Sequence, residues 1–273
     1  MKLADYINNW NKVIKSWMSS PSVSSYPNSY GVCIQSDYMP EPFMGDPDNY
    51  SFVIVNLNPG GGVCHSCEKQ KKTVGMLINK VKRIGYSDAV KDFPYLRDEK
   101  AVGLTNWNSS PGRKWWKSKE RWIKHMLHIC DPSYDPKSTI PDEYFPFAME
   151  LFAWHTKKWP EDLNTKIEKS GVYGKNIYND VIEPLHDAIR GSKYKFAFCV
   201  GKPIGTIIDS FGVFSKMNTS PIQPLSGVKR FYDIYHDGKG CYIINTWAQG
   251  GNTFPSKRFD TAEESICKIY GII

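Results

Sequence analysis

The residues of this chain best suited to chemistry follow a short apolar run. Residues 52–55 are apolar throughout, and residues 58–62 then read Asn-Pro-Gly-Gly-Gly. Three consecutive glycines let backbone amides approach a ligand closely, and the side-chain amide of Asn58 can both donate and accept hydrogen bonds. The chain has neither the Gly-x-Gly-x-x-Gly spacing nor the Lys-Ser/Thr ending of the nucleotide fingerprints. A ligand-binding loop, a phosphate-binding turn and a plain strand-to-helix turn all remain possible interpretations.

A Cys-x-x-Cys pair stands just after this segment, with His65 between Cys64 and Cys67. Zinc and iron–sulfur sites need about four ligands, and the chain has no second Cys-x-x-Cys pair. Cys33, Cys130 or His125 would have to complete such a site. We therefore expect no metal and no other cofactor. His65 is expected to contact a bound nucleotide, the alternative being an ordinary hydrogen-bonded loop histidine.

The elements that must position these residues alternate between short apolar strands and amphipathic helices. Four buried strands are expected at 52–55, 147–153, 196–200 and 241–244, the last in a hairpin that turns at Asp237-Gly238. Helices are expected at 3–17, 74–84, 122–129, 178–189 with a kink at Pro184, 204–211 and from Thr261 onward. This order predicts a three-layer α/β/α fold with a four-stranded, mostly parallel sheet. A single domain is expected over 1–273, with an N-terminal helix and loop at 1–45 packing on it.

The carboxyl ends of these strands are the expected place for a site. In open parallel sheets ligands bind where the strands end. Asn58, His155, Gly201 and Trp247 each follow or end an expected strand, so they should converge on one cleft.

Composition favours a polyanionic partner and a reducing compartment. The formal net charge is +7 over 273 residues, and Lys and Arg between 113 and 124 alternate with three tryptophans. Basic residues beside exposed aromatic rings suit nucleic acid, whereas a solvated helix face with the tryptophans turned inward is the alternative. Seven scattered cysteines and no apolar run near 18 residues predict a cytoplasmic protein with no membrane contact. DNA is the expected partner, and no obligate protein partner is expected.

Three short motifs in this order resemble the uracil-DNA glycosylase superfamily. Residues 55–60 look like the strand followed by Asn-Pro-Gly of its single-strand-selective and mismatch-specific branches. Val200-Gly201-Lys202-Pro203 resembles the element after the third strand, and 243–249 falls where the last motif of the family stands. The resemblance covers roughly 50–270 and rests mostly on the order of the elements.

This resemblance implies an enzyme that flips a base out of DNA and hydrolyses its N-glycosidic bond. Asn58 would position the attacking water. The implied base- or nucleotide-binding residues are Pro59, Gly60, Gly61, His65, Asn106, His155, Trp247 and Gln249. The implied DNA-binding residues are Lys71, Lys72, Lys202, Lys257 and Arg258.

The position of the family's base-recognition Asn depends on which segment is the second strand. If the strand is 147–153, the position falls near His155; if it is 102–105, the position is Asn106 or Asn108. The first segment is the better strand and the second supplies the better residue.

The sequence departs from the family at two positions that matter for uracil. Trp247-Ala248-Gln249 stands where the family has a His that stabilises the departing base, and Lys69-Gln70-Lys71-Lys72 stands where an aromatic residue stacks on it. We therefore expect a non-uracil or modified base, in DNA repair or phage defence. The alternatives are a catalytically inactive nucleic-acid-binding module on the same fold and a small-molecule nucleotide enzyme.

Overall fold

A computed structural model gives the fold of the chain. It describes residues 1–19, 29–32, 34–35, 38–57, 77–103, 107–109, 111–156, 162–223, 230–248 and 260–272. Within these residues the helices are α1 (Leu3–Ser19), α3 (Tyr86–Val90), α4 (Glu99–Val102), α5 (Pro111–Lys117), α6 (Glu120–Cys130), α7 (Leu163–Ile167), α8 (Gly174–Ile177), α9 (Glu183–Gly191), α10 (Lys202–Phe211) and α11 (Asp260–Ile269). Residues 77–84 are also helical.

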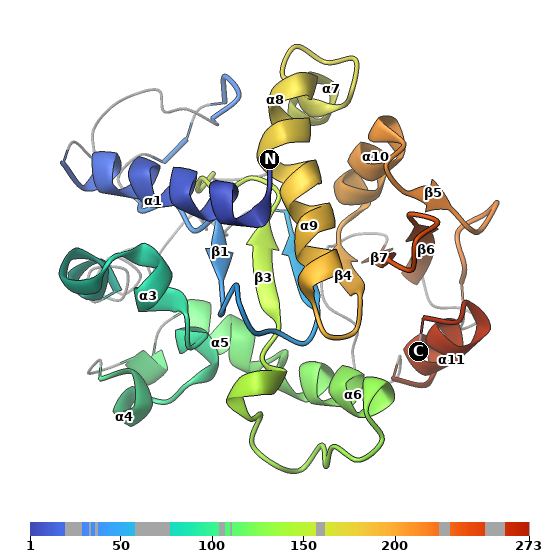
Figure 1. Ribbon diagram of the computed structural model, residues 1–273, viewed down its shortest axis with the longest axis horizontal. Coiled ribbons are helices and arrows are strands. Elements are labelled where there is room, and N and C mark those ends of the chain that lie inside the picture. Colours follow the sequence, from blue (N-terminus) through green and yellow to red (C-terminus); the bar gives the residue numbers. More distant parts are fainter. Residues whose placement is uncertain are drawn as a thin grey trace.

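A seven-stranded mixed sheet forms the centre of the protein (Figure 1). Its spatial order is β1 (Phe43–Met44), β3 (Phe147–Glu150), β2 (Val53–Asn56), β4 (Phe196–Val200), β7 (Tyr242–Ala248), β6 (Arg230–His236) and β5 (Ser215–Lys216). The inner four, β3, β2, β4 and β7, are mutually parallel, and β1, β6 and β5 are antiparallel to their neighbours.

The α/β class is confirmed, but the expected count of four strands is wrong. The four parallel strands are those that the apolar runs predict. β6 joins the sheet as the hairpin partner of β7, while β1 and β5 have only two residues each. Strands this short carry no periodicity, so only pairing with a neighbour defines them.

The second parallel strand is β3, which settles the choice between the two segments. Phe147 pairs with Val53, and Glu150 pairs with Asn56. Val102, by contrast, is the last residue of helix α4. The strand is shorter than the expected 147–153. The amides of Leu151 and Phe152 still donate to the carbonyls of Asn56 and Leu57, and after them the chain bonds to the segment before β1. The amide of Glu41 donates to the carbonyl of Ala153, and that of Gln35 donates to the carbonyl of His155.

Helices cover both faces of the sheet and make its core largely aromatic. On one face Trp122 of α6 packs 4.3 Å from Phe198 of β4, and Phe52 stacks on Phe196 at 4.9 Å between ring centroids. The opposite face is covered by α1, α9 and α10 (Figure 1). Burying one such aromatic side chain contributes about 1.5–3 kcal/mol, so these contacts fix the layers.

The expected helix over 178–189 is present, with a different local geometry at its kink. Residues Tyr178–Ile182 form a π-helical turn, and α9 starts at Glu183 with Pro184 in its first turn. Proline has no amide hydrogen to donate, and the wider turn before it accommodates the missing bond.

Candidate functional site

The strand register brings polar side chains into one row at the carboxyl ends of the parallel strands. In the parallel sheet, Asn56 of β2 lies beside Glu150 of β3. On the other side of β2, Val55 lies beside Cys199 of β4, and the next residue of β4, Val200, lies beside Thr246 of β7. Residues paired in this way point to the same face of a sheet. Asn56, Glu150 and Thr246 therefore share the face that α5 and α6 cover.

Glu150 and Asn56 form the centre of this row. The Asn56 amide Nδ2 donates to Glu150 Oε1 at 2.9 Å, and Asn56 is only 8% exposed. The other carboxyl oxygen of Glu150, Oε2, is shielded from solvent and has no hydrogen-bond partner among the described residues. Burial raises the pKa of Glu150 well above its usual range, Asn56 opposes this shift, and nearby Glu41 adds to it. Burial and the nearby Glu41 thus favour the protonated form of Glu150.

A second carboxyl group, that of Glu41, lies close to Glu150. The Tyr95 hydroxyl donates to Glu41 Oε1 at 3.1 Å. Burial raises the pKa of Glu41 to about 7, and the Tyr95 hydrogen bond partly opposes the shift. A carboxyl group with a pKa near the working pH can both accept and release a proton, as general acid–base catalysis requires.

The two carboxyl groups border a common cavity. Its volume is about 10 Å³, and its lining residues are Glu41, Phe43, Met44, Trp116, Ala148 and Glu150. A space of this size holds about one water molecule. The arrangement thus offers one water position between two carboxyl groups whose pKa values are raised by burial.

His155 is the sequence-predicted residue that the structure brings to this cluster. It is buried, with Nε2 at 3.8 Å from Glu41 Oε1 and its ring centroid 5.3 Å from that of Tyr38. When protonated, His155 would form an ion pair with Glu41 and favour its ionised form.

Trp247 and Lys202 do not join the cluster. Successive side chains of a strand point to opposite faces, so Trp247 lies on the other face of the sheet from Thr246. There it is half-buried and stacks on Phe231 with 5.8 Å between ring centroids. Lys202 is exposed in the first turn of α10, a helix on the same side.

The remaining predicted site residues lie outside the described part of the chain. They are Asn58, Pro59, Gly60, Gly61, His65, Lys71, Lys72, Asn106, Gln249, Lys257 and Arg258. Along the sequence, Asn58 comes two residues after the end of β2 at Asn56. Their predicted roles therefore stay predictions.

Sequence reasoning missed Asn56, Glu150 and Glu41. A signal was present for two of them, since Asn56 and Glu150 each interrupt an apolar run. A polar side chain within a buried strand needs a hydrogen-bond partner. Two polar residues in two neighbouring buried strands therefore indicate that their side chains bind each other. Glu41 stands in the segment Met-Pro-Glu-Pro-Phe, which carries no such signal.

A buried network of charged and polar groups lies farther along the same face. Arg230 Nη1 donates to Thr246 Oγ1 at 3.2 Å, and Arg230 is 4% exposed. Glu263 of α11 accepts from Trp122 Nε1 at 2.8 Å and from the Tyr232 hydroxyl at 3.2 Å. Burial lowers the pKa of Arg230, but a guanidinium stays charged at neutral pH. This edge therefore carries a buried positive charge at one end and two carboxyl groups at the other.

The basic residues between 113 and 124 alternate with three tryptophans, which were expected either to face nucleic acid or to turn into the core. The structure shows both arrangements. Trp116 and Trp122 are buried in the core, as the alternative interpretation expects. Trp115 is 42% exposed, and Lys119 Nζ lies 5.2 Å from the centroid of its ring. One exposed ring beside a cation is a modest platform for a stacked base.

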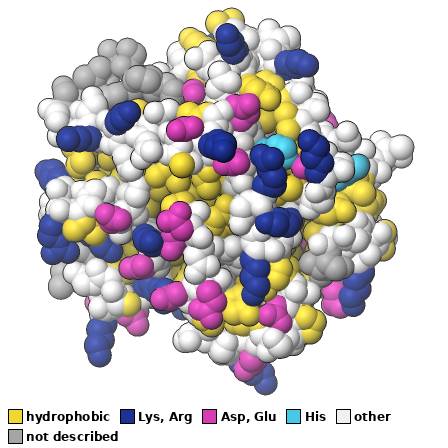
Figure 2. All heavy atoms as spheres, in the orientation of Figure 1, with side chains coloured by type: hydrophobic (Ala, Val, Ile, Leu, Met, Phe, Trp, Pro, Cys, Tyr) yellow, Lys and Arg dark blue, Asp and Glu magenta, His cyan; other side chains and the backbone are white. Residues whose placement is uncertain are grey.

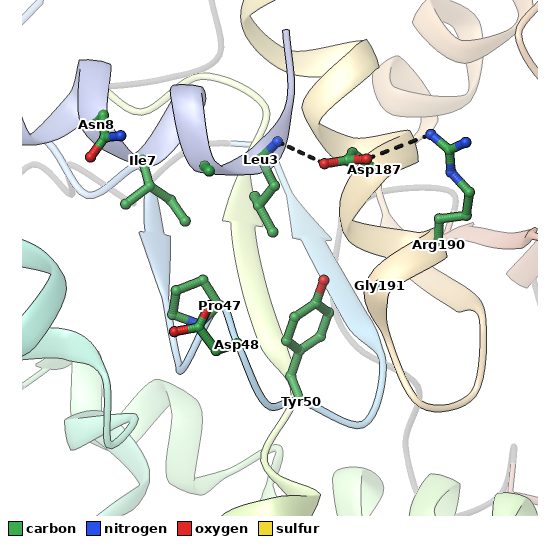
Figure 3. A pocket seen from close by; sticks show the side chains of 10 residues that line it. Leu3, Ile7, Asn8, Pro47, Asp48, Tyr50, Asp187, Arg190 and Gly191 are labelled. Carbon is green, nitrogen blue, oxygen red and sulfur yellow. Dashed lines mark hydrogen bonds and ion pairs between the residues drawn. The ribbon is translucent and has the colours of Figure 1, made fainter.

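A hollow of about 560 Å³ lies away from the polar row, between α1, the segment before β2 and the end of α9 (Figure 3). Apolar side chains such as Leu3 and Ile7 line it, and hydrophobic surface is visible between α1 and α9 (Figure 2). At its rim Asp187 accepts from the amide of Leu3 at 2.9 Å and lies 3.5 Å from Arg190. The polar groups of Leu3, Asp187 and Arg190 at this rim are thus bound to one another.

Comparison with known protein families, with curated proteins and with solved structures gives no match to this chain. Among the described helices, none is long and apolar enough to cross a membrane. The case for a function therefore rests on the residues themselves.

Proposed function

We propose that this protein is a DNA glycosylase that hydrolyses the N-glycosidic bond of a non-uracil or modified base, on a fold like that of the uracil-DNA glycosylases. One observation carries the proposal. Two residues before Asn58, the end of β2 presents Asn56 hydrogen-bonded to the buried acid Glu150, with Glu41 beside it.

The chemistry of the reaction matches these groups. Hydrolysis of an N-glycosidic bond passes through a sugar with positive charge, and a carboxylate nearby stabilises that charge. Water supplies the hydroxyl group that replaces the base at the sugar carbon, and its proton must finally reach the leaving base. Glu41, with a pKa of about 7, can accept this proton, and burial favours the neutral form of its neighbour Glu150. Asn58 would hold the water.

Exposed Lys202, half-buried Lys119 and the exposed ring of Trp115 support contact with DNA. Lys202 lies in the first turn of α10, where the helix N-terminus also attracts phosphate. Trp115 and Lys119 offer a ring and a charge on the side of the sheet that carries the carboxyl pair. Base flipping requires such backbone contacts around the reaction site.

The second candidate is a nucleic-acid-binding module without catalysis. The exposed Trp115 beside Lys119 favours it, because this pair serves binding and takes no part in bond cleavage. On this view the Asn56–Glu150 pair only joins β2 to β3.

An abasic-site assay separates the two candidates. Purified protein would be incubated with uracil-containing, mismatched and hypermodified DNA and then treated with alkali, which cleaves abasic sites. We expect cleavage of one modified substrate by the wild type, and a loss of about 100-fold or more in Asn58→Ala, which removes the water holder, and in Glu41→Gln, which removes the acid–base group. Exposed Glu143→Gln is the matched control and should keep full activity.

The opposite result has a clear meaning. If no substrate is cleaved while DNA binding weakens steeply with salt, the binding module is the correct function. If cleavage occurs and Glu41→Gln retains it, Glu41 is not the acid–base group and the reaction uses other residues.

A further inference from the structure

A second group of chemically reactive side chains lies at the opposite edge of the sheet. His186 of α9 approaches Asp237 and Cys241, which flank the turn between β6 and β7. One possible ligand atom from each residue lies within 4.8 Å of the other two. The turn precedes β7, so this group is at the amino end of the parallel strands, away from Asn56 and Glu150.

The backbone of the turn fixes the carboxylate of Asp237. Its Oδ1 accepts the amide hydrogens of Lys239 at 2.7 Å and Cys241 at 3.0 Å. Gly238 and Gly240 have φ angles of +73° and +93°, which a residue with a side chain rarely adopts. The tight turn therefore holds Oδ1 and directs Oδ2 to His186 Nε2, 2.8 Å away. Hydrogen bonds of this kind commonly orient a carboxylate that binds a metal.

One of the three side chains is open to solvent, so an ion can reach the group from that side. The side chain of Asp237 is only 2% exposed and Cys241 is buried, whereas that of His186 is 21% exposed. The imidazole is thus the open side of the group, and the carboxylate and thiol form its floor.

Two cations near the group, those of Lys195 and Arg190, are engaged elsewhere. Lys and Arg side chains gather over α9 and the loop that follows it (Figure 2). Among them, Lys195 donates to the carbonyl of Arg190, and the Arg190 guanidinium lies 3.5 Å from Asp187. One carboxylate and one thiolate would carry two negative charges, enough to neutralise a divalent ion.

We propose that His186, Asp237 and Cys241 bind a zinc ion, with water as the fourth ligand. An imidazole nitrogen, a carboxylate oxygen and a sulfur are the three ligand types that zinc accepts together in a tetrahedral site. The mixture of soft sulfur with nitrogen and oxygen disfavours magnesium and calcium, which take oxygen ligands.

Binding exchanges hydrogen bonds for metal bonds. The Cys241 thiol loses its proton to solvent as the sulfur–zinc bond forms, and the His186–Asp237 hydrogen bond gives way to nitrogen–zinc and oxygen–zinc bonds. Tetrahedral geometry with bonds of about 2.0–2.1 Å puts these two ligand atoms about 3.3 Å apart. The present 2.8 Å separation needs to open by only a fraction of an ångström, which a small rotation of the half-exposed imidazole supplies.

A bound zinc ion would link α9 to the turn between β6 and β7. Zinc at this place would stabilise the folded protein without touching the Glu41–Glu150 cavity at the other edge. The zinc site is therefore independent of the proposed glycosylase activity, and either can fail alone.

Zinc binding to the full chain tests the proposal. Zinc affinity would be measured by competition with a chromophoric chelator, and thermal unfolding would be followed with and without zinc. We expect one zinc whose affinity falls at least tenfold in His186→Ala and in Cys241→Ser, together with loss of the zinc-dependent rise in Tm. Cobalt in place of zinc should give a thiolate charge-transfer absorption that Cys241→Ser abolishes.

Matched variants separate this site from other cysteines and histidines. Cys267→Ser removes another buried thiol, and His236→Gln changes a histidine beside the same turn. The double variant Cys64→Ser/Cys67→Ser removes the Cys-x-x-Cys pair. Each of these three variants should bind zinc with the affinity of the wild type. Equal affinity in the wild type and His186→Ala would overturn the proposal. So would a loss of binding confined to the double variant. His186→Ala alters a partly exposed side chain, so the test stands even if Cys241→Ser fails to fold.

Discussion

Replacing Glu41 by glutamine removes a carboxyl group whose pKa burial raises from 4.5 to about 7. In the unfolded chain this group ionises at its ordinary pKa, so between the two values the unfolded state loses its proton first. The folded state is therefore destabilised as pH rises from about 4.5 to 7. The glutamine keeps an oxygen that accepts from the Tyr95 hydroxyl, so only the titration is lost.

The size of the effect follows from the shift. Each pKa unit corresponds to about 1.4 kcal/mol, and between pH 5 and pH 8 the two titration curves differ by about 2.5 kcal/mol. The side chain of Glu41 is 16% exposed, so solvent screening removes only part of this. We expect the wild type to lose about 2 kcal/mol of stability over that range beyond what Glu41→Gln loses.

Urea denaturation at pH 5 and pH 8 measures the difference. Glu143→Gln, which changes an exposed carboxyl group, should follow the wild type at both pH values. A remaining pH dependence in Glu41→Gln belongs to other acids whose pKa values burial raises in the same direction, such as Glu150, Asp180 and Asp209. Equal losses in the wild type and Glu41→Gln would refute the burial of this acid and with it the acid–base role proposed for it.

Two further variants test the packing around the sheet by denaturation. Tyr232→Phe removes one hydrogen-bond donor from the buried carboxylate of Glu263 and should lower the free energy of unfolding by about 1–2 kcal/mol. Tyr242→Phe, at a half-buried tyrosine, is the control. Equal stability of the two variants would contradict a stabilising Tyr232–Glu263 hydrogen bond. Gly45→Ala places a methyl group 2.7 Å from the carbonyl of Pro146 at a φ of +108°, whereas Gly85→Ala meets nothing within 4 Å at a φ of +86°. The first should therefore be less stable than the second by about 1–3 kcal/mol, and a difference near zero would show that the backbone at Gly45 relaxes.

The sequence predicts the parallel part of the sheet because each of its strands is buried on both faces. Apolar runs such as the one at 196–200 have no polar residue that would mark a solvent-facing side, and the structure buries all five residues. The hairpin at Asp237-Gly238 was predicted for a similarly local reason, since its glycine takes a positive φ. The short strands β1 and β5 could not be predicted, because two residues have no pattern.

The sequence predicts a site at the carboxyl ends of the parallel strands, but it does not predict the residues Asn56, Glu150 and Glu41 that the structure places there. The carboxyl edge of the sheet follows from strand order alone, and His155 was expected there and lies 3.8 Å from Glu41. Trp247 was expected there too, but alternation along β7 turns it to the other face from Thr246. If β7 were shifted by one residue against its neighbours, Trp247 would point to the face that carries Thr246. The sequence near Trp247 does not fix how β7 aligns with β4 and β6.

The sequence by itself determined the order along the chain of the four parallel strands and of the longer helices, and with it the edge where these strands end, because these depend on local apolar patterns. The tertiary structure decided which groups meet: Glu41 with Glu150, and His186 with Asp237. The members of these pairs are far apart in the chain, and their contact depends on how the strands and helices pack. Burial then sets their chemistry, since a carboxyl group acquires a pKa near 7 only where the fold excludes water from it.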